Sequence, residues 1–572
     1  MPPTMIPRFR PWLLAAMFSV ACPKQAPGPL APVPTLSQQK LVAEVEALAQ
    51  RAEKLLAEQQ ELIWKNWIDA APVEINKTYL GTESLFSLES IRKIEQLRSS
   101  LLEQFQCVSH QQGVEIYCAN PASAEQLRAL THLHMHFVGE YLSLLLSEQN
   151  GAIANLEASL SFSVKGRDYL YRDLERLLAV EKNTELRHAL YAGATQAHKR
   201  LAQSIQRRDE KAEGIIRDLG YPSYSAFGQE MRQTDLAQLA VTAEEVLTQT
   251  QSRYLDLLET LGQSELRIPR ERLQCSDLAR IFRARADAPL SKAELLSKAQ
   301  KTLGQLGIPL GEMKNITLDL RELQTKNPLP ITLPIAVPRD IRVSLKPGGT
   351  IRDAFQLFRE LGHALPYSFI DNSLGRGKQP PAGLKETRFE LTKLGNRTLN
   401  ESYSLLIEDL AEDPRWLEEA AGIPRARAIA QVAASSARRL YQLRRRAGHF
   451  LYEMQLHPAT ADQATDAYVR TMSRAYGVAF GPEDAARKMT DQDELYRSAD
   501  DLRASFLAAQ LKAHLVAQFG SPWWSNPNAA KLLQGLWARG TSLSADEIAR
   551  RLGDRAVSPN DLLDQATRAA MH

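Results

Sequence analysis

Apolar and polar positions alternate along most of the chain with the period of an α-helix. In 41–67 and 184–219, apolar residues recur every three or four positions between charged ones, and few prolines interrupt them. Two short runs, 331–337 and 340–345, are instead rich in β-branched residues and contain prolines, which is typical of a sheet edge. The pattern therefore predicts a mainly α-helical protein with one small β-sheet.

The amino terminus has the pattern of a secretory signal. Arg8 and Arg10 precede the apolar run 12–21, which is too short to remain as a membrane-spanning helix. The run ends in Ser19-Val-Ala-Cys22, which resembles the lipobox of bacterial lipoproteins and predicts lipidation at Cys22. The alternative is an ordinary signal peptide, cut elsewhere, with Cys22 incidental.

The segment that follows, 22–36, carries five prolines and almost no charge, so we expect an extended tether that buries no core. These features divide the chain into a signal peptide (1–21), a lipidated, proline-rich tether (22–36) and a helical body (37–572). We expect an exported protein that a lipid alone anchors in the bacterial envelope. Lys24 is not the Asp that retains lipoproteins in the inner membrane, which favours a periplasmic, outer-membrane-associated location.

Charge and cysteine content narrow the function further. The 70 basic and 67 acidic side chains nearly cancel, so no overall field favours nucleic acid, and we expect no such partner. Four cysteines are too few for a disulfide scaffold. Cys107 and Cys118 flank a β-rich run, 113–117, and either pair across a hairpin or remain two free thiols. Cys275 is left over.

The turn at 346–350 lacks the Gly-Lys-Ser/Thr ending of a phosphate loop, and the helix that it opens carries the informative chemistry. Residues 359–363 read Arg-Glu-Leu-Gly-His, one letter from His-Glu-x-x-His. In that motif two histidines on one helix face bind Zn²⁺, and the glutamate activates the metal-bound water. Glu360 and His363 are in place as general base and metal ligand. Arg359 is not a ligand, because a guanidinium offers no lone pair.

The neighbouring segments strengthen this comparison. Residues 340–349 and 357–365 closely resemble the edge strand and active-site helix of gluzincin zinc metallopeptidases of the angiotensin-converting-enzyme and thimet-oligopeptidase type. The segment 400–417 resembles the later helix that supplies the third ligand, which would be Glu401. Less specific matches are 219–224 and 500–519. The chain thus resembles a bacterial lipoprotein member of that superfamily with a degenerate zinc motif.

The resemblance implies a two-lobed, mostly helical fold around a deep channel, with a small β-sheet beside the active-site helix. It also implies a zinc cofactor bound by His363 and Glu401, and short peptides as substrates. Three departures argue against hydrolysis. Arg359 leaves two protein ligands where the chemistry uses three, so we expect zinc to be absent or weakly bound. Pro366 stands where relatives often have His and should kink or end the helix. No tyrosine lies in 500–505 to stabilise an oxyanion, and Tyr496 is the nearest.

Arg359 has a physical role in this reading. Without zinc, Glu360 and Glu401 would face each other as like charges in a partly buried cleft. We therefore expect the planar Arg359 guanidinium to bond Glu401 and to take the electrostatic place of the metal. Alternatively, Glu401 is simply an exposed helix residue.

The remaining histidines offer weaker metal candidates. His132, His134 and His136 lie on one expected helix, with His132 and His136 on the face of Glu140, but no glutamate follows His132 as a base. Paired surface histidines explain this run better than a metal site does. His449 and His457 read as packing or surface residues.

Two functions from different classes remain. The first is a zinc-deficient pseudopeptidase that binds short peptides, or another envelope protein, in its channel. The alternative is an active zinc-dependent oligopeptidase or dipeptidase with a weakened or unorthodox metal site. A third reading is a purely structural helical protein, which an absent or filled channel would favour.

Overall fold

The structure is a computed structural model that describes residues 36–70, 82, 84–110, 115–283, 288–371, 374, 389–395, 397–457 and 460–568. The predicted signal peptide, Cys22 and the tether lie outside these residues, except that Leu36 begins the first helix. None of the described helices combines the length and the apolar composition that a bilayer span requires.

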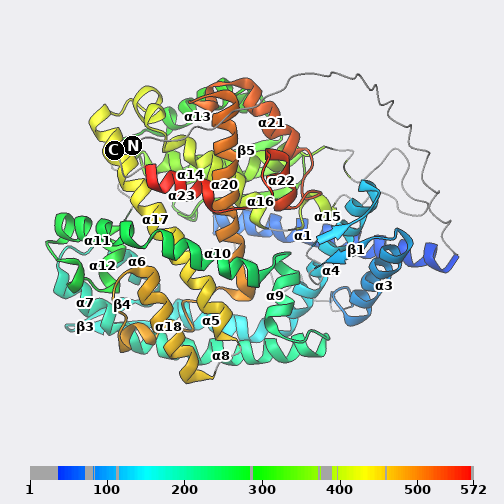
Figure 1. Cartoon of the computed structure of the whole chain (residues 1–572), viewed down its shortest axis with the longest axis horizontal. Coiled ribbons are helices and arrows are strands. Elements are labelled where there is room, and N and C mark those ends of the chain that lie inside the picture. Colours follow the sequence, from blue (N-terminus) through cyan, green and yellow to red (C-terminus); the bar gives the residue numbers. More distant parts are fainter. Residues whose placement is uncertain are drawn as a thin grey trace, which may run out of the picture.

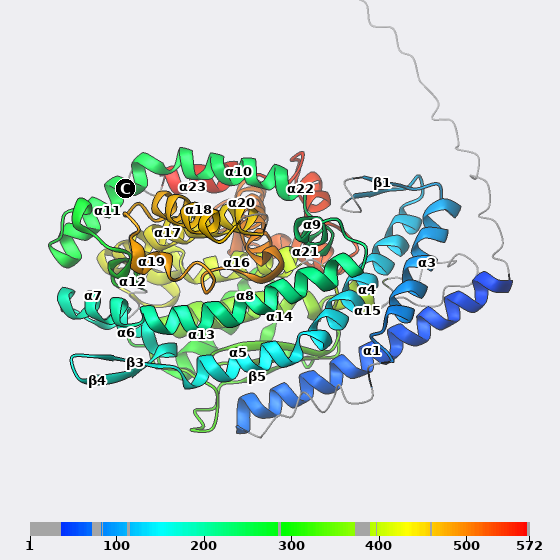
Figure 2. The same ribbon diagram turned by 90° about the horizontal axis from the view of Figure 1, so that it is seen from below.

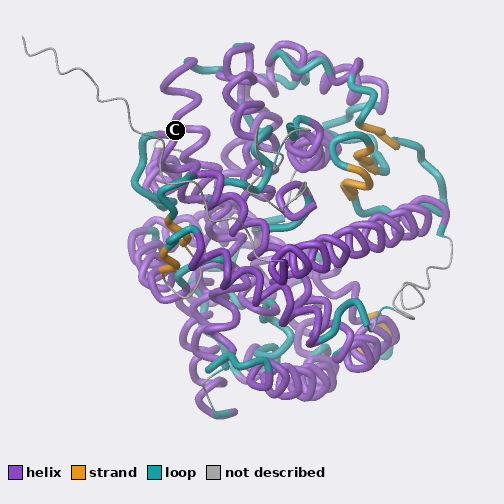
Figure 3. Tube along the Cα trace, turned by 90° about the vertical axis from the view of Figure 1, so that its right-hand side faces the viewer, coloured by secondary structure: helices purple, strands orange, loops and turns teal. Residues whose placement is uncertain are grey.

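Helices make up most of the described chain, and strands are few (Figure 3). The helices are α1 (Leu36–Asp69), α3 (Leu88–Gln104), α4 (Pro121–Leu145), α5 (Ser147–Ser159), α6 (Leu174–Val180), α7 (Thr184–Gly193), α8 (Thr195–Asp218), α9 (Tyr224–Arg232), α10 (Leu236–Gln249), α11 (Gln251–Leu266), α12 (Cys275–Ile281), α13 (Lys292–Leu306), α14 (Arg352–Ser368), α15 (Phe389–Thr392), α16 (Arg397–Ala411), α17 (Arg425–Leu456), α18 (Ala461–Tyr476), α19 (Pro482–Ala485), α20 (Arg497–Phe519), α21 (Pro527–Trp537), α22 (Ala545–Leu552) and α23 (Asn560–Arg568).

The strands form two hairpins and one three-stranded sheet. They are β1 (Val108–His110), β2 (Glu115–Tyr117), β3 (Ser161–Val164), β4 (Arg167–Leu170), β5 (Ile316–Asp319), β6 (Ile331–Ala336) and β7 (Asp340–Ser344). In the larger sheet the order is β5-β7-β6, with β7 parallel to β5 and antiparallel to β6. The expectation that 340–345 is an edge strand is therefore wrong. The strand β5, which precedes β6 in the chain, supplies a parallel neighbour whose short, partly polar run gave no clear sequence signal.

The predicted helical class and the small sheet are confirmed. The run 41–67 lies inside α1, and 500–519 lies inside α20, which begins three residues earlier at Arg497. The run 184–219 is helical but divides into α7 and α8 around Ala194. Periodicity alone does not mark such a break, because both helices keep their own apolar face.

Two large hydrophobic cores account for most of the buried apolar residues. The first joins α1, α3, α4 and α8–α12 to α17 and α18, and the second joins α13, α14, α16, α21 and α22 to the three-stranded sheet. Helix α20 crosses the middle of the molecule and serves both (Figure 1). Its residues Leu502 and Phe506 lie in the first core, whereas Leu507 and Leu511 lie in the second. Helices α1, α3 and α4 flank one side of the molecule (Figure 2).

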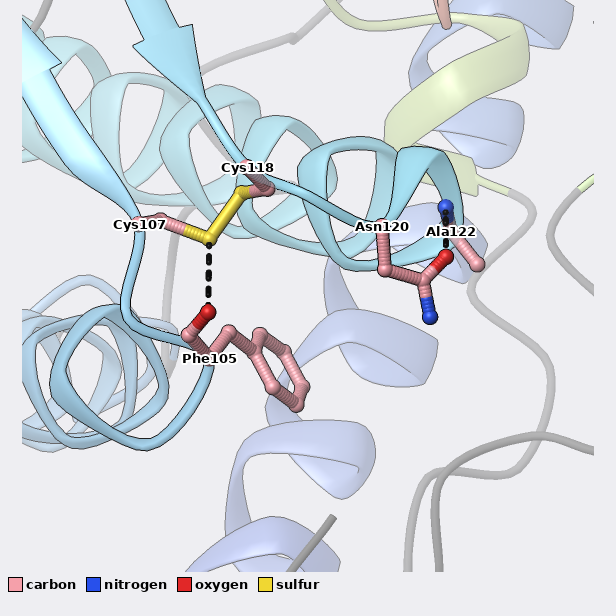
Figure 4. Close-up of a disulfide and its surroundings, with 5 residues drawn as sticks. All are labelled: Phe105, Cys107, Cys118, Asn120 and Ala122. Atoms are coloured by element: carbon pink, nitrogen blue, oxygen red, sulfur yellow. Dashed lines mark hydrogen bonds between the residues drawn. A yellow bond between two sulfur atoms is a disulfide. The ribbon is translucent and has the colours of Figure 1, made fainter. Parts of the chain in front are cut away.

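Cys107 and Cys118 form a disulfide at the base of the β1–β2 hairpin (Figure 4). Val108 pairs with Tyr117 in this hairpin, so the two cysteines occupy the next register position. The Asn120 side chain then caps α4 by accepting a hydrogen bond from the backbone N–H of Ala122 at 3.0 Å. The structure thus has the paired alternative rather than two free thiols. Gly113 and Val114 lie outside the described residues.

Candidate functional site

The candidate site is built on α14 and α16, which cross each other closely. Asp353 fixes the start of α14, because its carboxylate accepts the backbone N–H groups of Gly348, Gly349 and Thr350 at 2.8–3.1 Å. These loop N–H groups, which a phosphate would need, are therefore already satisfied. At Gly362, an added Cβ would lie only 2.6 Å from Ser404 Cα. The absent side chain is what lets the two helices approach.

Glu360, the position of the general base, is buried at the contact between α14 and the sheet. It is 7% exposed, and its Oε2 accepts a hydrogen bond from Thr332 Oγ1 at 2.7 Å. The same hydroxyl lies 3.1 Å from the Glu360 carbonyl oxygen. Thr332 belongs to β6, so the small sheet does lie beside this helix and holds one of its carboxylates.

His363 is oriented by α16. Its Nδ1 contacts Asn400 Oδ1, while Asn400 Nδ2 donates to the His363 carbonyl at 3.3 Å. The second contact fixes the amide so that its oxygen faces the ring, and Nδ1–H is the donor. In the neutral ring this leaves the lone pair on Nε2. Metal-binding histidines are commonly oriented in this way, by a hydrogen bond from the ring nitrogen that does not face the metal.

Arg359 occupies the first ligand position and bridges two carboxylates of α16. Its Nη2 donates to Glu401 Oε2 at 2.9 Å, and its Nη1 donates to Glu408 Oε2 at 2.9 Å. The predicted bond between Arg359 and Glu401 is therefore confirmed. Glu401 is 5% exposed, so the alternative of an exposed helix residue is wrong. Burial lowers the pKa of Arg359, but Glu408 and Glu401 raise it more.

A second arginine completes the neutralisation of Glu401. Arg397 lies one turn earlier on α16 and forms an ion pair through its Nη2 with Glu401 Oε1. Burial raises the pKa of Glu401, but His363, Arg359 and Arg397 together hold it below its usual value. The carboxylate is therefore charged, with each oxygen bound to a guanidinium.

This donor set does not fit a zinc ion. Both oxygens of Glu401 are engaged by guanidinium groups, and a divalent cation beside His363 would lie next to the positive charge of Arg359. Zinc sites in proteins take three or four lone-pair donors. Within the residues that the structure describes, no group of three or more His, Cys, Asp and Glu side chains is arranged to hold a metal ion.

Pro366 and Tyr496 are the two other positions at which the sequence departs from the gluzincin pattern. Of the two expected effects of Pro366, a kink or an end of the helix, the structure excludes the end, because α14 continues through Pro366 to Ser368. The fixed φ of proline is helical, and only one backbone hydrogen bond is lost within the last turn. Tyr496 is 1% exposed and packs against Gly228 and Tyr224 in the first core.

The histidine run of α4 packs into the fold rather than lying on the surface, with His132 and His134 buried and His136 partly exposed. His132 and His134 are 3% and 6% exposed, and His132 Nδ1 contacts the Glu390 carbonyl oxygen at 3.0 Å. His136 lies among the rings of Phe86 and Phe389. Burial lowers the pKa of each of the three histidines to about 4, so they are packed as neutral side chains.

The two remaining candidate histidines also pack within the fold. His449 lies 3.4 Å from Asp491 and from the Tyr476 hydroxyl, and His457 stacks on Tyr224 with ring centroids 3.7 Å apart. Their contacts are with these residues, so neither replaces the missing ligand at Arg359.

Four residues of the site were not predicted: Thr332, Arg397, Asn400 and Glu408. Two of them had a signal in the sequence, because Arg397 and Glu408 stand four residues before and seven after Glu401, on the same helix face. The other two depend on how the sheet and the two helices pack.

The chain matches no protein-family model, and no curated protein matches it.

Proposed function

We propose that the chain is a zinc-independent, gluzincin-like lipoprotein of the bacterial envelope. Its helical body would form two lobes around a channel that binds short peptides, or another envelope protein, without hydrolysing them. The observation that carries the proposal is the Arg359 guanidinium bridging Glu401 and Glu408 at 2.9 Å each. A peptidase of this type needs a metal at that position, whereas here a fixed positive charge balances the same carboxylates.

The packing around the site supports the proposed gluzincin-like fold. Two hydrophobic cores that share α17 and α20 are what two lobes around a channel would require. Helices α14 and α16 cross closely at Gly362, and Glu360 stays buried beside the sheet. These features fit a chain that keeps the framework of an active gluzincin site. The Cys107–Cys118 disulfide suits an exported protein, since disulfides persist in the periplasm.

One observation favours the alternative, an active peptidase with a weakened metal site. The His363 ring is held through Nδ1 by Asn400, which leaves Nε2 available as a ligand, and Glu360 is still present as a base. If Arg359 and Arg397 swung away, His363 and Glu401 could supply two ligands. The experiment below separates the two functions.

The decisive measurement is zinc binding by the purified mature protein and three variants. Arg359→His adds a ligand, Arg359→Gln removes the charge without adding one, and Arg359→His/Arg397→Gln also frees the second oxygen of Glu401. We expect zinc bound one to one only by the two histidine variants, and more tightly by the double variant. All forms are then incubated with a mixed pool of short peptides, and bound and cleaved peptides are identified by mass spectrometry.

The proposal predicts that wild-type protein retains intact peptides, or an envelope protein in a pull-down from membranes. If the wild type instead binds one zinc and cleaves peptides, and Glu360→Gln abolishes the cleavage, the alternative is correct. If no form binds peptides or a partner, the protein is structural and the proposal fails.

A further inference from the structure

A cavity of about 310 Å³ lies among α16, α17, α20 and α23. Its volume falls at the lower end of the range for small-molecule sites. Arg359 and Glu408 reach one side of it, and the rest of its lining belongs to residues that the proposed pseudopeptidase site does not use. Leu405, Leu443 and Leu562 give it an apolar part.

The acidic groups of the cavity are already neutralised. Glu408 and Asp409 belong to the last turns of α16, and Glu412 follows directly after its end. Glu408 pairs with Arg359, Asp409 pairs with Lys512 at 2.7 Å and with Arg439, and Glu412 pairs with Arg439. The three cations in these pairs also line the cavity.

Two further cations of the lining have no such counter-ion. Arg438 and Arg446 stand eight residues apart on α17, with Gln442 between them on the same face. Among the described residues neither forms an ion pair, and Arg446 donates through Nη1 to the neutral Ser505 hydroxyl at 2.7 Å. A guanidinium has five N–H donors, so most of those on Arg446 remain available.

The environment of Arg446 is costly for a cation. Burial and the nearby Arg359 guanidinium lower its pKa more than the carboxylates of Asp501, Glu401 and Glu408 raise it. A carboxylate or phosphate of a ligand would supply both the missing charge and acceptors for the free N–H groups.

We propose that this cavity binds a small organic oxyanion. The carboxylate or phosphate of the ligand is held by Arg446, with Arg438 adding positive potential, and its apolar part lies against the leucines of the wall. The ligand is either the free carboxyl end of a short peptide or a separate organic acid or phosphate ester. The inference stands on Arg438 and Arg446 and does not depend on whether zinc binds at Glu401.

The test measures the binding of five probes to the mature protein by calorimetry. N-acetyl-leucine and phenyl phosphate carry an oxyanion and an apolar group, and N-acetyl-leucinamide is the neutral counterpart. Trialanine with a free or an amidated carboxyl end tests the peptide source. We expect both small oxyanions or free-acid trialanine to bind, and the matching amides to bind at least about tenfold more weakly.

Variants locate the binding. Arg446→Gln should weaken oxyanion binding about 10- to 100-fold, and Arg438→Gln, at a half-exposed position, should weaken it less. Arg427→Gln is the matched control, because it removes the same charge from an exposed position on α17 that does not line the cavity. Equal binding of acids and amides, unchanged binding in both cavity variants, or no binding of any probe at millimolar concentration would overturn the inference. Binding of the small acids without trialanine supports the inference while leaving the peptide-binding proposal unsupported.

Discussion

The guanidinium of Arg359 neutralises two carboxylates of α16, Glu401 and Glu408. Glu401 is almost fully buried, and a buried carboxylate without a partner costs several kcal/mol. Arg359 donates to it and to Glu408 from a fixed planar fork, which a lysine could not do with the same geometry. The residue at the first ligand position of the motif therefore stabilises the two carboxylates beside it.

Removing this charge should destabilise the fold. Arg359 is 31% exposed, so we expect Arg359→Ala to cost about 1–3 kcal/mol, less than the loss of a fully buried partner. Urea unfolding at pH 7 measures the change. The triple variant Arg359→Ala/Glu401→Gln/Glu408→Gln should regain much of the lost free energy of unfolding, because neither carboxylate is then present without its Arg359 partner. A single variant as stable as the wild type would show that the two ion pairs contribute nothing.

The buried histidines of α4 should make stability depend on pH. Burial lowers the pKa of His136 to about 4, while the unfolded chain has an ordinary histidine pKa of about 6.5. Its contribution is therefore fully present above pH 6.5 and is lost as pH falls towards 4, because the unfolded state binds the proton first.

The variant His136→Phe keeps an aromatic ring between Phe86 and Phe389 and removes the titrating group. We expect the free energy of unfolding of the wild type to fall faster than that of the variant between pH 6.5 and 4, by about 1.4 kcal/mol per pH unit. Denaturant unfolding across this range checks it. Above pH 7 the two slopes should agree, and parallel curves at lower pH would contradict a neutral buried imidazole.

At the level of elements, the crossing of α14 and α16 depends on Gly362. An alanine Cβ there would meet Ser404 Cα at 2.6 Å and the Tyr403 carbonyl oxygen at 2.8 Å, and backbone atoms cannot move aside locally. We expect Gly362→Ala to destabilise the protein by about 1–3 kcal/mol.

The matched control is Gly214→Ala in α8, where an added Cβ meets nothing within 4 Å. This change should stabilise the protein by about 0.5–1 kcal/mol through helix propensity. Thermal and urea unfolding of both variants give the comparison. Equal effects from the two glycines would mean that the helices do not rely on this close contact.

The β1–β2 hairpin is constrained by a covalent bond, the Cys107–Cys118 disulfide. Cys107 and Cys118 are separated by 11 residues, and closing so short a loop should contribute about 3 kcal/mol by restricting the unfolded chain. The double variant Cys107→Ala/Cys118→Ala should lower the free energy of unfolding by about that amount. Reducing agent should shift the unfolding midpoint of the wild type and leave the variant unaffected; a midpoint that does not respond would mean the thiols are unpaired in solution.

For the whole molecule, the two hydrophobic cores share α17 and α20, which also line the charged cavity that Arg359 reaches. Ligands at this junction would contact helices that serve both cores. A ligand there stabilises the entire fold by mass action if it binds the folded state alone.

We expect removal of metal ions to leave the midpoint of thermal unfolding unchanged. We expect the protein purified without chelator and the same protein dialysed against EDTA to unfold at one temperature, since guanidinium groups rather than a metal balance Glu401 and Glu408. Differential scanning calorimetry makes the comparison, with Arg359→His as the form that should respond to added zinc. A midpoint that falls in EDTA and recovers with zinc would contradict the proposal.

Much of the fold and part of the site followed from local pattern. Apolar residues at three- and four-residue spacing identified the helices now seen as α1, α7 and α8, and β-branched runs identified β6 and β7. The charge of Arg359 and its position relative to Glu401 were enough to expect their bond, because few groups can neutralise a buried carboxylate.

The tertiary structure decided the rest, since it depends on which faces meet. The central place of β7, the Thr332 contact to Glu360 and the Asn400 contact to His363 arise from packing between segments far apart in the chain. The same is true of the cavity and its two unmatched arginines. Periodicity and residue chemistry act within one helix or strand, whereas burial, counter-ions and hydrogen-bond partners are properties of contacts between them.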